Sequence, residues 1–495
     1  MKLQDLNIVV IGAGIGGLAA GALLAHKGAA VTVLEAQDCA GGCAATFSRN
    51  GYCFDAGATI GCGFHTGAPM ETLGKELGIA WPVVPEAVAW QYRHRALLFD
   101  LQPNRLDILE RFPHSAPFWA EQNALAKLLW HFSEGWLSWP VKGAGDLLRL
   151  ARKGIAGFSG TLHLLPFARK TAHEWLASHG LDTDPDFVRF IDAQLLISVQ
   201  TTSHHANAIN AAIALDLPVA GAYHVKGGIG TVSRMLAGSI EENGGAVLYR
   251  KQVIRIDSVR RQVFGVETSD GSALAADYVL ANLTPDSLAQ FIEAEDEPVA
   301  ERKEGSLWSA FALYLGMDPA LFGALSSPHL QIIGSSGELA EGHSIFVSVS
   351  SSDEPDRAPA ALCAVTVSTH VRPEPWFEAK KRGEGAYSEL KSLYTERVLD
   401  LFSEQFPDVR TAIRSITAAT PVTWERYTGR DQGCVGGYPQ TSLFKVRGPL
   451  TRFNNLFLVG DSIFPGQSLP GVVTGARRTV ELLLQRNAKV GSQQP

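Results

Sequence analysis

The chain has 495 residues, of which 46% are hydrophobic and 19% are charged, and its formal net charge is −7. This composition is typical of a globular protein with a large core, and the length suits two or three domains. The negative charge gives no general affinity for nucleic acid, and six cysteines in so long a chain do not make a disulfide framework.

The amino-terminal segment predicts a strand over residues 7–11, a glycine-rich turn, a helix and a second strand over residues 30–34. Glu35 follows the second strand directly. In this order of elements, the glycines let backbone N–H groups approach a pyrophosphate at the helix N-terminus, and the acidic residue accepts hydrogen bonds from a ribose. The segment therefore predicts a dinucleotide-binding βαβ unit. Its expected ligand contacts are Gly12, Ala13, Gly14, Gly16, Gly17, Glu35 and Ala36.

The same segment contains a run without charged side chains, residues 8–25, which is long enough to raise the alternative of a membrane-spanning helix. Five of these residues are glycines in the arrangement of the phosphate-binding turn. The strand–turn–helix interpretation explains all of them, so no membrane-spanning helix is expected here.

Two further glycine turns follow the βαβ unit. Gly41 and Gly42 come a few residues after Glu35, and residues 50–59 supply a hairpin-like strand that ends in another glycine turn. A glycine pair at this place lets the backbone reach a diphosphate from its other side, which favours FAD over NAD. The expected cofactor contacts in these turns are Gly41, Gly42, Cys43, Gly57, Ala58 and Thr59.

Four cysteines gather in the same turns and raise the alternative of a metal site. A metal site would need paired ligands, typically at CxxC spacing, and these cysteines fall instead within the glycine-rich loops. No metal is therefore predicted. The four are Cys39, Cys43, Cys53 and Cys62.

Residues 111–222 combine tryptophans with basic residues. Tryptophan prefers the headgroup layer of a membrane and basic residues prefer anionic lipid, so an interfacial helix is one interpretation. A solvated helix face is the other. The tryptophans are Trp119, Trp130, Trp136 and Trp139. The basic residues are Lys142, Arg149, Arg152, Lys153, Arg169 and Lys170.

The rest of the chain is rich in short segments with β-branched and aromatic residues, which predict strands. In the middle part these are residues 246–250, 252–256, 263–268 and 278–281. A later group is residues 309–315, 344–350 and 361–369. A sheet with apolar side chains over a flavin would suit an apolar ligand, although such side chains also make an ordinary core.

Near the carboxyl terminus, residues 455–459 predict an apolar strand, and a helix is expected to begin near Pro470. A carboxylate at the strand end can hold the ribityl hydroxyls of a flavin. A helix N-terminus facing the pyrimidine edge stabilises the negative charge of the reduced flavin. The expected contacts are Gly460, Asp461, Pro470, Gly471 and Val472.

Residues 12–57 and 457–478 together resemble the FAD-dependent carotenoid desaturase and isomerase family, which includes phytoene desaturases, C-3′,4′ desaturases, prolycopene isomerases and retinol saturases. Residues 223–230, 429–433 and 464–472 extend the similarity, so it covers most of the chain. Cys43 stands where many relatives carry arginine, and Ser468 replaces a common glycine. The resemblance also implies that the backbone of Val253 contacts adenine.

The resemblance implies an α/β protein with a Rossmann-type FAD-binding domain of the glutathione reductase kind and a discontinuous, mixed α+β substrate domain. The expected FAD-binding parts are residues 1–110, 223–290 and 430–487. The expected substrate and membrane-contact parts are residues 111–222 and 291–429, and residues 488–495 form a polar tail.

The implied function is desaturation of a long apolar isoprenoid polyene, a carotenoid, by hydride transfer to flavin N5. Because no second complete nucleotide fingerprint is found, quinone or oxygen is the expected electron acceptor. A lipid-dissolved substrate implies a cytoplasmic protein bound peripherally to the membrane surface. His65, just past a flavin turn, is the candidate proton acceptor.

Two alternatives stay open. The same pocket would serve a reduced-flavin cis/trans isomerase or a polyene saturase. Outside enzymes, lipid-binding escort proteins share this fold, but the complete FAD motifs at both ends of this chain argue against that role.

Overall fold

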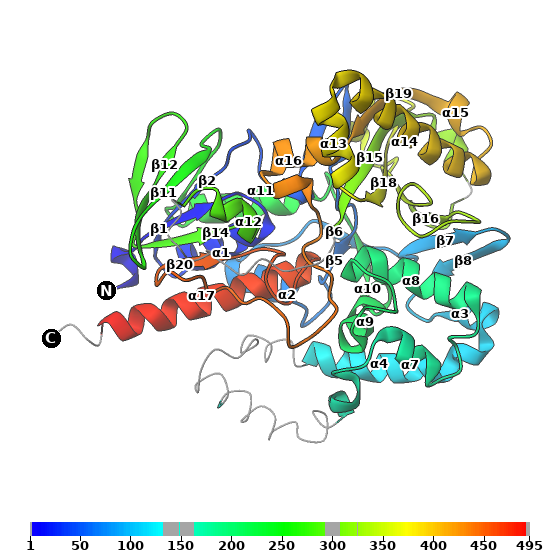
Figure 1. The fold of residues 1–495 in the computed structure, drawn as a ribbon, viewed down its shortest axis with the longest axis horizontal. Helices are drawn as coiled ribbons and strands as arrows, with labels where there is room; N and C mark the ends of the chain where they lie inside the picture. The colour runs from blue at the N-terminus through cyan, green and yellow to red at the C-terminus, as the bar shows by residue number, and fades with distance from the viewer. Residues whose placement is uncertain (1, 132–147, 149–162, 293–306, 324, 492–495) are drawn as a thin grey trace.

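A computed structural model describes the chain except residues 1, 132–147, 149–162, 293–306, 324 and 492–495 (Figure 1). Its first layer is a five-stranded parallel sheet. The strands, in spatial order, are β10 (Ala246–Leu248), β2 (Ala30–Leu34), β1 (Asn7–Ile11), β14 (Tyr278–Ala281) and β20 (Leu456–Leu458). Most of their residues are buried, as expected for a parallel sheet covered on both faces.

Helix α1 (Ile15–His26) crosses from β1 to β2, which pair in parallel, so the predicted βαβ unit is present. The helix packs between α11 (Gly230–Glu242) and α17 (Leu469–Gly491), and every residue from Ile15 to Ala25 is buried. Its uncharged sequence therefore reflects burial in the core. None of the helices in the described part of the chain is long and apolar enough to cross a membrane.

A small antiparallel sheet lies beside this layer. It consists of β11 (Val253–Val259), β12 (Gln262–Thr268) and β13 (Ala273–Ala275). The strands expected from residue 252 to 268 are present, although β11 continues to Val259, and the strand expected over residues 246–250 ends at Leu248. Helix α17 begins at Leu469, one residue before the expected place.

The second large sheet has seven strands. In order they are β19 (Ile413–Ala419), β15 (Ser309–Met317), β18 (Cys363–Val371), β17 (Ser344–Val349), β16 (His329–Ile333), β7 (Trp90–His94) and β8 (Leu97–Leu101). One face is covered by α13 (Glu374–Arg382) and α14 (Glu384–Gln405), whose apolar side chains share a core with the sheet. Figure 1 shows this sheet and its helices apart from the five-stranded sheet.

The first boundary expected from the sequence, at residue 110, is wrong for one hairpin. Strand β7 pairs in parallel with β16, and β8 pairs with β7, so residues 90–101 belong to the seven-stranded sheet. The place of this hairpin in the sheet depends on pairing with β16, more than 200 residues further along the chain. No local sequence pattern predicts that pairing.

A helical cluster adjoins this hairpin. It contains α4 (Ala116–His131), α7 (Ala172–Ala177), α8 (Pro185–Val199) and α9 (Ala208–Ala214). Trp119 is 4% exposed and lies under the Arg105 guanidinium, and Trp130 donates a hydrogen bond to Asp216 Oδ2 at 2.8 Å. Both tryptophans contribute to the helical cluster, Trp119 as a buried side chain and Trp130 as a half-buried one. Apart from Arg169 and Lys170, the remaining tryptophans and basic residues of this segment lie outside the described residues. They are Trp136, Trp139, Lys142, Arg149, Arg152 and Lys153.

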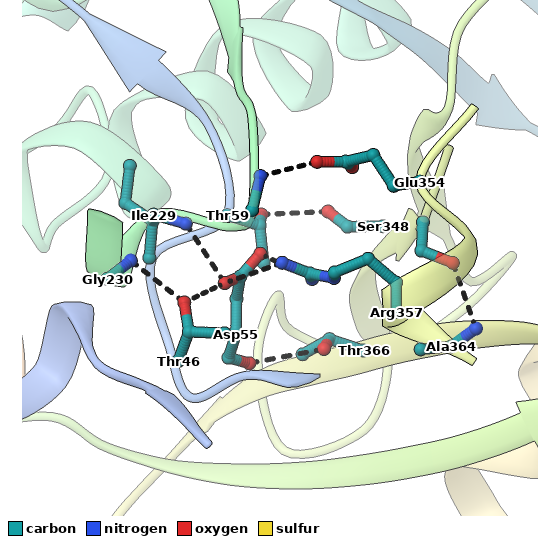
Figure 2. Close-up of polar contacts among 12 residues, drawn as sticks. Thr46, Asp55, Thr59, Ile229, Gly230, Ser348, Glu354, Arg357, Ala364 and Thr366 are labelled. Atoms are coloured by element: carbon teal, nitrogen blue, oxygen red, sulfur yellow. Dashed lines mark hydrogen bonds and ion pairs between the residues drawn. The ribbon is translucent and has the colours of Figure 1, made fainter. Parts of the chain in front are cut away.

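A buried ion pair links the hairpin of residues 46–55 to the short helix Pro355–Arg357, which follows β17 (Figure 2). Asp55, the last residue of β4 (Tyr52–Asp55), accepts a hydrogen bond from Arg357 Nη2 at 2.9 Å, and both residues are 7% exposed. The same carboxylate accepts from the Thr46 hydroxyl at 2.6 Å and from the Ile229 N–H at 3.0 Å. Asp55 therefore joins the hairpin of residues 46–55, the start of α11 and the segment that follows β17.

Candidate active site

A cavity of about 560 Å³ lies between the two large sheets. This volume is within the range of small-molecule sites. One side is formed by residues that follow β1, β2, β14 and β20, so it lies at the carboxyl ends of the parallel strands, where open α/β sheets bind ligands. The other side is formed by the seven-stranded sheet and α8.

On the side of the parallel sheet, the cavity wall is the backbone of glycine-rich turns, which we call the dinucleotide cradle. A Cβ atom on Gly14 would lie 2.5 Å from Asn282 Nδ2, and one on Gly16 would lie 2.6 Å from the Gly460 Cα. Only glycine lets these segments approach so closely, and the exposed N–H groups of such a turn bind phosphate. The cradle therefore fits the diphosphate of a dinucleotide.

Glu35 stands at the end of β2 with its carboxylate fixed. The Ala13 N–H donates to Oε2 at 2.7 Å and the Gln37 N–H donates to Oε1 at 2.9 Å. Burial raises the pKa of Glu35, and these backbone donors oppose the rise. Because each carboxylate oxygen keeps a second lone pair, the group remains able to accept hydrogen bonds from ribose hydroxyls.

Most of the residues proposed from the sequence as cofactor contacts line this cavity. They are Gly12, Gly14, Gly16, Glu35, Ala36, Gly41, Gly42, Cys43, Gly57, Ala58, Thr59, Val253, Gly460, Asp461 and Val472. Ala13 and Gly17 lie behind the lining, where a Cβ on Gly17 would meet the Gly12 carbonyl oxygen at 2.4 Å. Pro470 and Gly471 are in the first turn of α17 and do not line the cavity.

His65, the proton acceptor proposed from the sequence, does not line this cavity. Its ring is perpendicular to that of Trp130, with centroids 5.7 Å apart. Burial lowers the pKa of His65, which keeps the imidazole neutral near pH 7. The structure thus places His65 among the helical cluster contacts, away from the place where a ligand would bind.

An arginine that the sequence interpretation did not include lies in the cofactor side of the cavity. Arg430 Nη2 donates to Asp461 Oδ1 at 2.8 Å, so the carboxylate expected at the ribityl chain is part of an ion pair. Burial is the largest influence on the pKa of Arg430 and lowers it, but the charge of Asp461, the nearby Cys43 and the hydrogen bond to Asp461 together raise the pKa by more, so the guanidinium is always charged. The motif at residues 429–433 marked this segment as similar to relatives without indicating the pair.

The other side of the cavity has no charged lining residue in the described part of the chain. The charged residues of the lining are Glu35, Lys251, Arg426, Arg430 and Asp461, which belong to or adjoin the dinucleotide cradle. The lining between the seven-stranded sheet and α8 is apolar or neutral. It includes Ile60, Trp90, Ile197, Ser198, Gln200, Leu217, Ala310, Phe346, Ser368, Thr369, His370 and Gln467.

A family model described as flavin containing amine oxidoreductase matches residues 15–484. The chain belongs to this family. Prolycopene isomerase 1 of an Oncidium hybrid cultivar is 26% identical, over 99% of this chain and 86% of the relative. A lycopene-forming phytoene desaturase of a Paracoccus species is 25% identical, over 96% of this chain and 97% of the relative. A crystal structure of an oxidoreductase from Methanosarcina mazei has a TM-score of 0.64 at 18% identity, covering 96% and 100% of the two chains.

These matches confirm the resemblance, the fold class and the enzyme class expected from the sequence. A flavin in a dinucleotide-binding cradle is FAD, so the family membership and the geometry agree on the cofactor. The protein is a flavin-dependent oxidoreductase related to carotenoid enzymes.

We expect the Asp461–Arg430 pair to control the charge at the flavin. In Asp461→Asn the carboxylate charge is lost while the guanidinium stays, and extra positive charge favours a reduced, anionic flavin. The midpoint potential of the bound FAD should therefore rise in a potentiometric titration. Asp257→Asn, in an exposed ion pair with Arg255, is the matched control and should leave the potential unchanged. An unaltered potential in both variants would show that the pair does not act on the flavin.

Proposed function

We propose that the protein is an FAD-dependent dehydrogenase that introduces a double bond into a long, uncharged isoprenoid polyene and passes the electrons to quinone or oxygen. The observation that carries this proposal is the uncharged lining between the seven-stranded sheet and α8.

The family description mentions amines, and the cavity argues against an amine substrate in this chain. An aliphatic ammonium group is charged at neutral pH, and its burial without a partner is very unfavourable. Among the described lining residues outside the cofactor side, there is no aspartate or glutamate to compensate that charge. An uncharged hydrocarbon has no such cost, and its burial is favourable by about 0.8 kcal/mol per methylene.

Some lining residues would bind the cofactor, and others would bind the substrate and exclude water. Gly14, Gly16 and Glu35 would hold the dinucleotide, and bound FAD would supply the two-electron acceptor for a hydride from the substrate. Trp90 and Phe346, whose rings meet edge to face at 5.9 Å, would hold the polyene chain and keep water from it.

Isomerisation is the second candidate, because one relative of nearly full coverage is named a prolycopene isomerase. The same uncharged cavity would accept a polyene for that reaction. A saturase that draws electrons from a nicotinamide fits less well, because the chain has a single complete nucleotide fingerprint.

A polyene dissolves in lipid and not in water, so we also propose that the protein docks on a membrane surface. Leu148 and Leu165 are 54% and 62% exposed, and Arg169 nearby in sequence is exposed. Leu165→Asp should weaken sedimentation with anionic liposomes, whereas Leu98→Asp should not, although Leu98 on β8 is 56% exposed. Equal sedimentation of both variants would contradict docking through this segment.

The substrate class is tested by anaerobic flavin reduction. Purified holo-protein is mixed with an acyclic carotenoid in liposomes or, separately, with an aliphatic monoamine. We expect the flavin absorbance to bleach with the polyene and to persist with the amine. Bleaching by the amine alone would refute the proposal, and a geometric isomer formed without net bleaching would favour isomerisation.

A further inference from the structure

We propose that His370 accepts the proton that leaves the substrate carbon when the double bond forms. This inference deepens the proposed function and depends on it. It replaces His65 with a histidine that the folded chain places in the cavity.

His370 is the second-last residue of β18 and lines the uncharged side of the cavity together with Ser368 and Thr369. It is the one imidazole in the described lining. The ring of Trp308 is perpendicular to it, with centroids 6.0 Å apart, and fixes its plane. A base in this position would face an apolar ligand bound against the seven-stranded sheet.

The other lining groups that could take a proton are already engaged or are poor acceptors. Glu35 receives two backbone N–H groups at the cofactor side, and Asp461 is ion-paired with a guanidinium. Burial raises the pKa of the Cys43 thiol and raises that of Cys62 to about 12, so both are protonated at neutral pH. This leaves His370 as the neutral base of the described lining.

One ring nitrogen of His370 is occupied by Gln200. The amide Nε2 of Gln200 lies 3.2 Å from His370 Nε2, and the backbone carbonyl of Gln200 accepts from the indole N–H of Trp308 at 3.0 Å. Gln200 is 4% exposed and has a φ of 60° after α8, an uncommon conformation for a residue other than glycine. The residue is therefore clamped against the imidazole.

This contact decides which nitrogen can act. As placed, Gln200 Oε1 is buried without a partner. A half turn of the Gln200 side-chain amide exchanges the places of its oxygen and nitrogen. In that orientation Oε1 accepts a hydrogen bond from the Nε2–H of His370. Nδ1 then carries the free lone pair. No hydrogen bond to Nδ1 is made by the described residues, so we assign the accepting role to Nδ1.

The C–H bond next to the oxidised carbon breaks, its electron pair forms the new C=C bond, and the proton binds Nδ1 to give an imidazolium. The neighbouring carbon would give up a hydride, for which bound FAD would be the oxidant. Burial lowers the pKa of His370 to about 4, so the imidazolium releases its proton to water before the next turnover. A weak base suffices, because a proton adjacent to an electron-deficient allylic carbon is strongly acidic.

The test compares His370→Ala, His370→Phe and, as a matched control outside the cavity, His65→Ala. We expect both His370 variants to keep their FAD and their affinity for the polyene. They should form dehydrogenated product at about one hundredth of the wild-type rate or below. Added imidazole should restore much of the rate in His370→Ala, where the ring has left space, and none in His370→Phe. His65→Ala should keep the wild-type rate.

Nitrogen-15 NMR of the resting holo-protein gives a readout independent of turnover. The ring signals of His370, assigned by their loss in the alanine variant, should show a protonated Nε2 and an unprotonated Nδ1. A protonated Nδ1, or a wild-type rate in His370→Ala, would overturn the assignment while the proposed function stands. If the wild-type protein forms no dehydrogenated product, the proposed function fails, and the role of His370 fails with it.

Discussion

Arg357→Ala should destabilise the protein by about 3–5 kcal/mol, because it leaves the Asp55 carboxylate charged and buried without its ionic partner. Arg357 is held at the far side of the pair by the short helix Pro355–Arg357, which follows β17 (Figure 2). The Thr46 hydroxyl and the Ile229 N–H remain as donors to Asp55, but neither supplies a compensating charge. We expect a clear fall in the unfolding temperature by calorimetry.

The control for this variant is Arg410→Ala. Arg410 contacts Glu396 at 2.9 Å and Asp400 at 2.7 Å, but the pairs are exposed, and exposed pairs contribute roughly 1 kcal/mol or less. Its unfolding temperature should stay close to that of the wild type. Equal, small shifts in the two variants would show that the buried pair contributes no more to stability than an exposed one.

Gly16→Ala should remove most of the bound FAD without unfolding the protein. The new Cβ would lie 2.6 Å from the Cα and 2.8 Å from the backbone nitrogen of Gly460, so two backbone segments of the cradle must separate. A forced fit of this kind costs about 1–3 kcal/mol, which weakens FAD binding roughly ten- to hundredfold if it falls on the bound state. Equilibrium dialysis of the apoprotein against FAD measures the affinity.

Gly238→Ala is the matched glycine control. Gly238 lies within α11, where an added Cβ meets no atom within 4 Å. Alanine favours a helix over glycine by about 1 kcal/mol, so this variant should be as stable as the wild type or more so and should bind FAD normally. Wild-type FAD affinity in Gly16→Ala would contradict the place we assign to the diphosphate.

The parts of the fold that local sequence could predict are those with short-range causes. The βαβ unit from Asn7 to Glu35 was predictable because the glycines, the apolar strands and the acid occur in one continuous segment with fixed order. The same holds for β14, and for β20 with the following Gly460 and Asp461, which line the cavity as expected. The hairpin β7–β8 was misplaced, because its sheet is determined by pairing with β16 far along the chain.

The substrate side of the site depends on contacts that no local pattern reports. His65 was proposed for its nearness in sequence to a flavin turn, yet it packs on Trp130. His370 lies just after the strand predicted over residues 361–369, and no local pattern marked it as a site residue. Only the packing of β18 against the end of α8 places it beside Gln200. Trp119 was proposed for membrane contact because tryptophan is common at membrane surfaces. It is 4% exposed, since aromatic side chains pack equally well in a helical core.

The central claim is that an uncharged cavity beside FAD serves the dehydrogenation of a polyene. The most direct test incubates holo-protein with liposomes that carry an acyclic carotenoid, a quinone and no NADPH, and then measures the mass of the product. The account predicts a polyene that has lost two hydrogens for each quinone reduced. A polyene of unchanged mass, or one that has gained hydrogen, would contradict it.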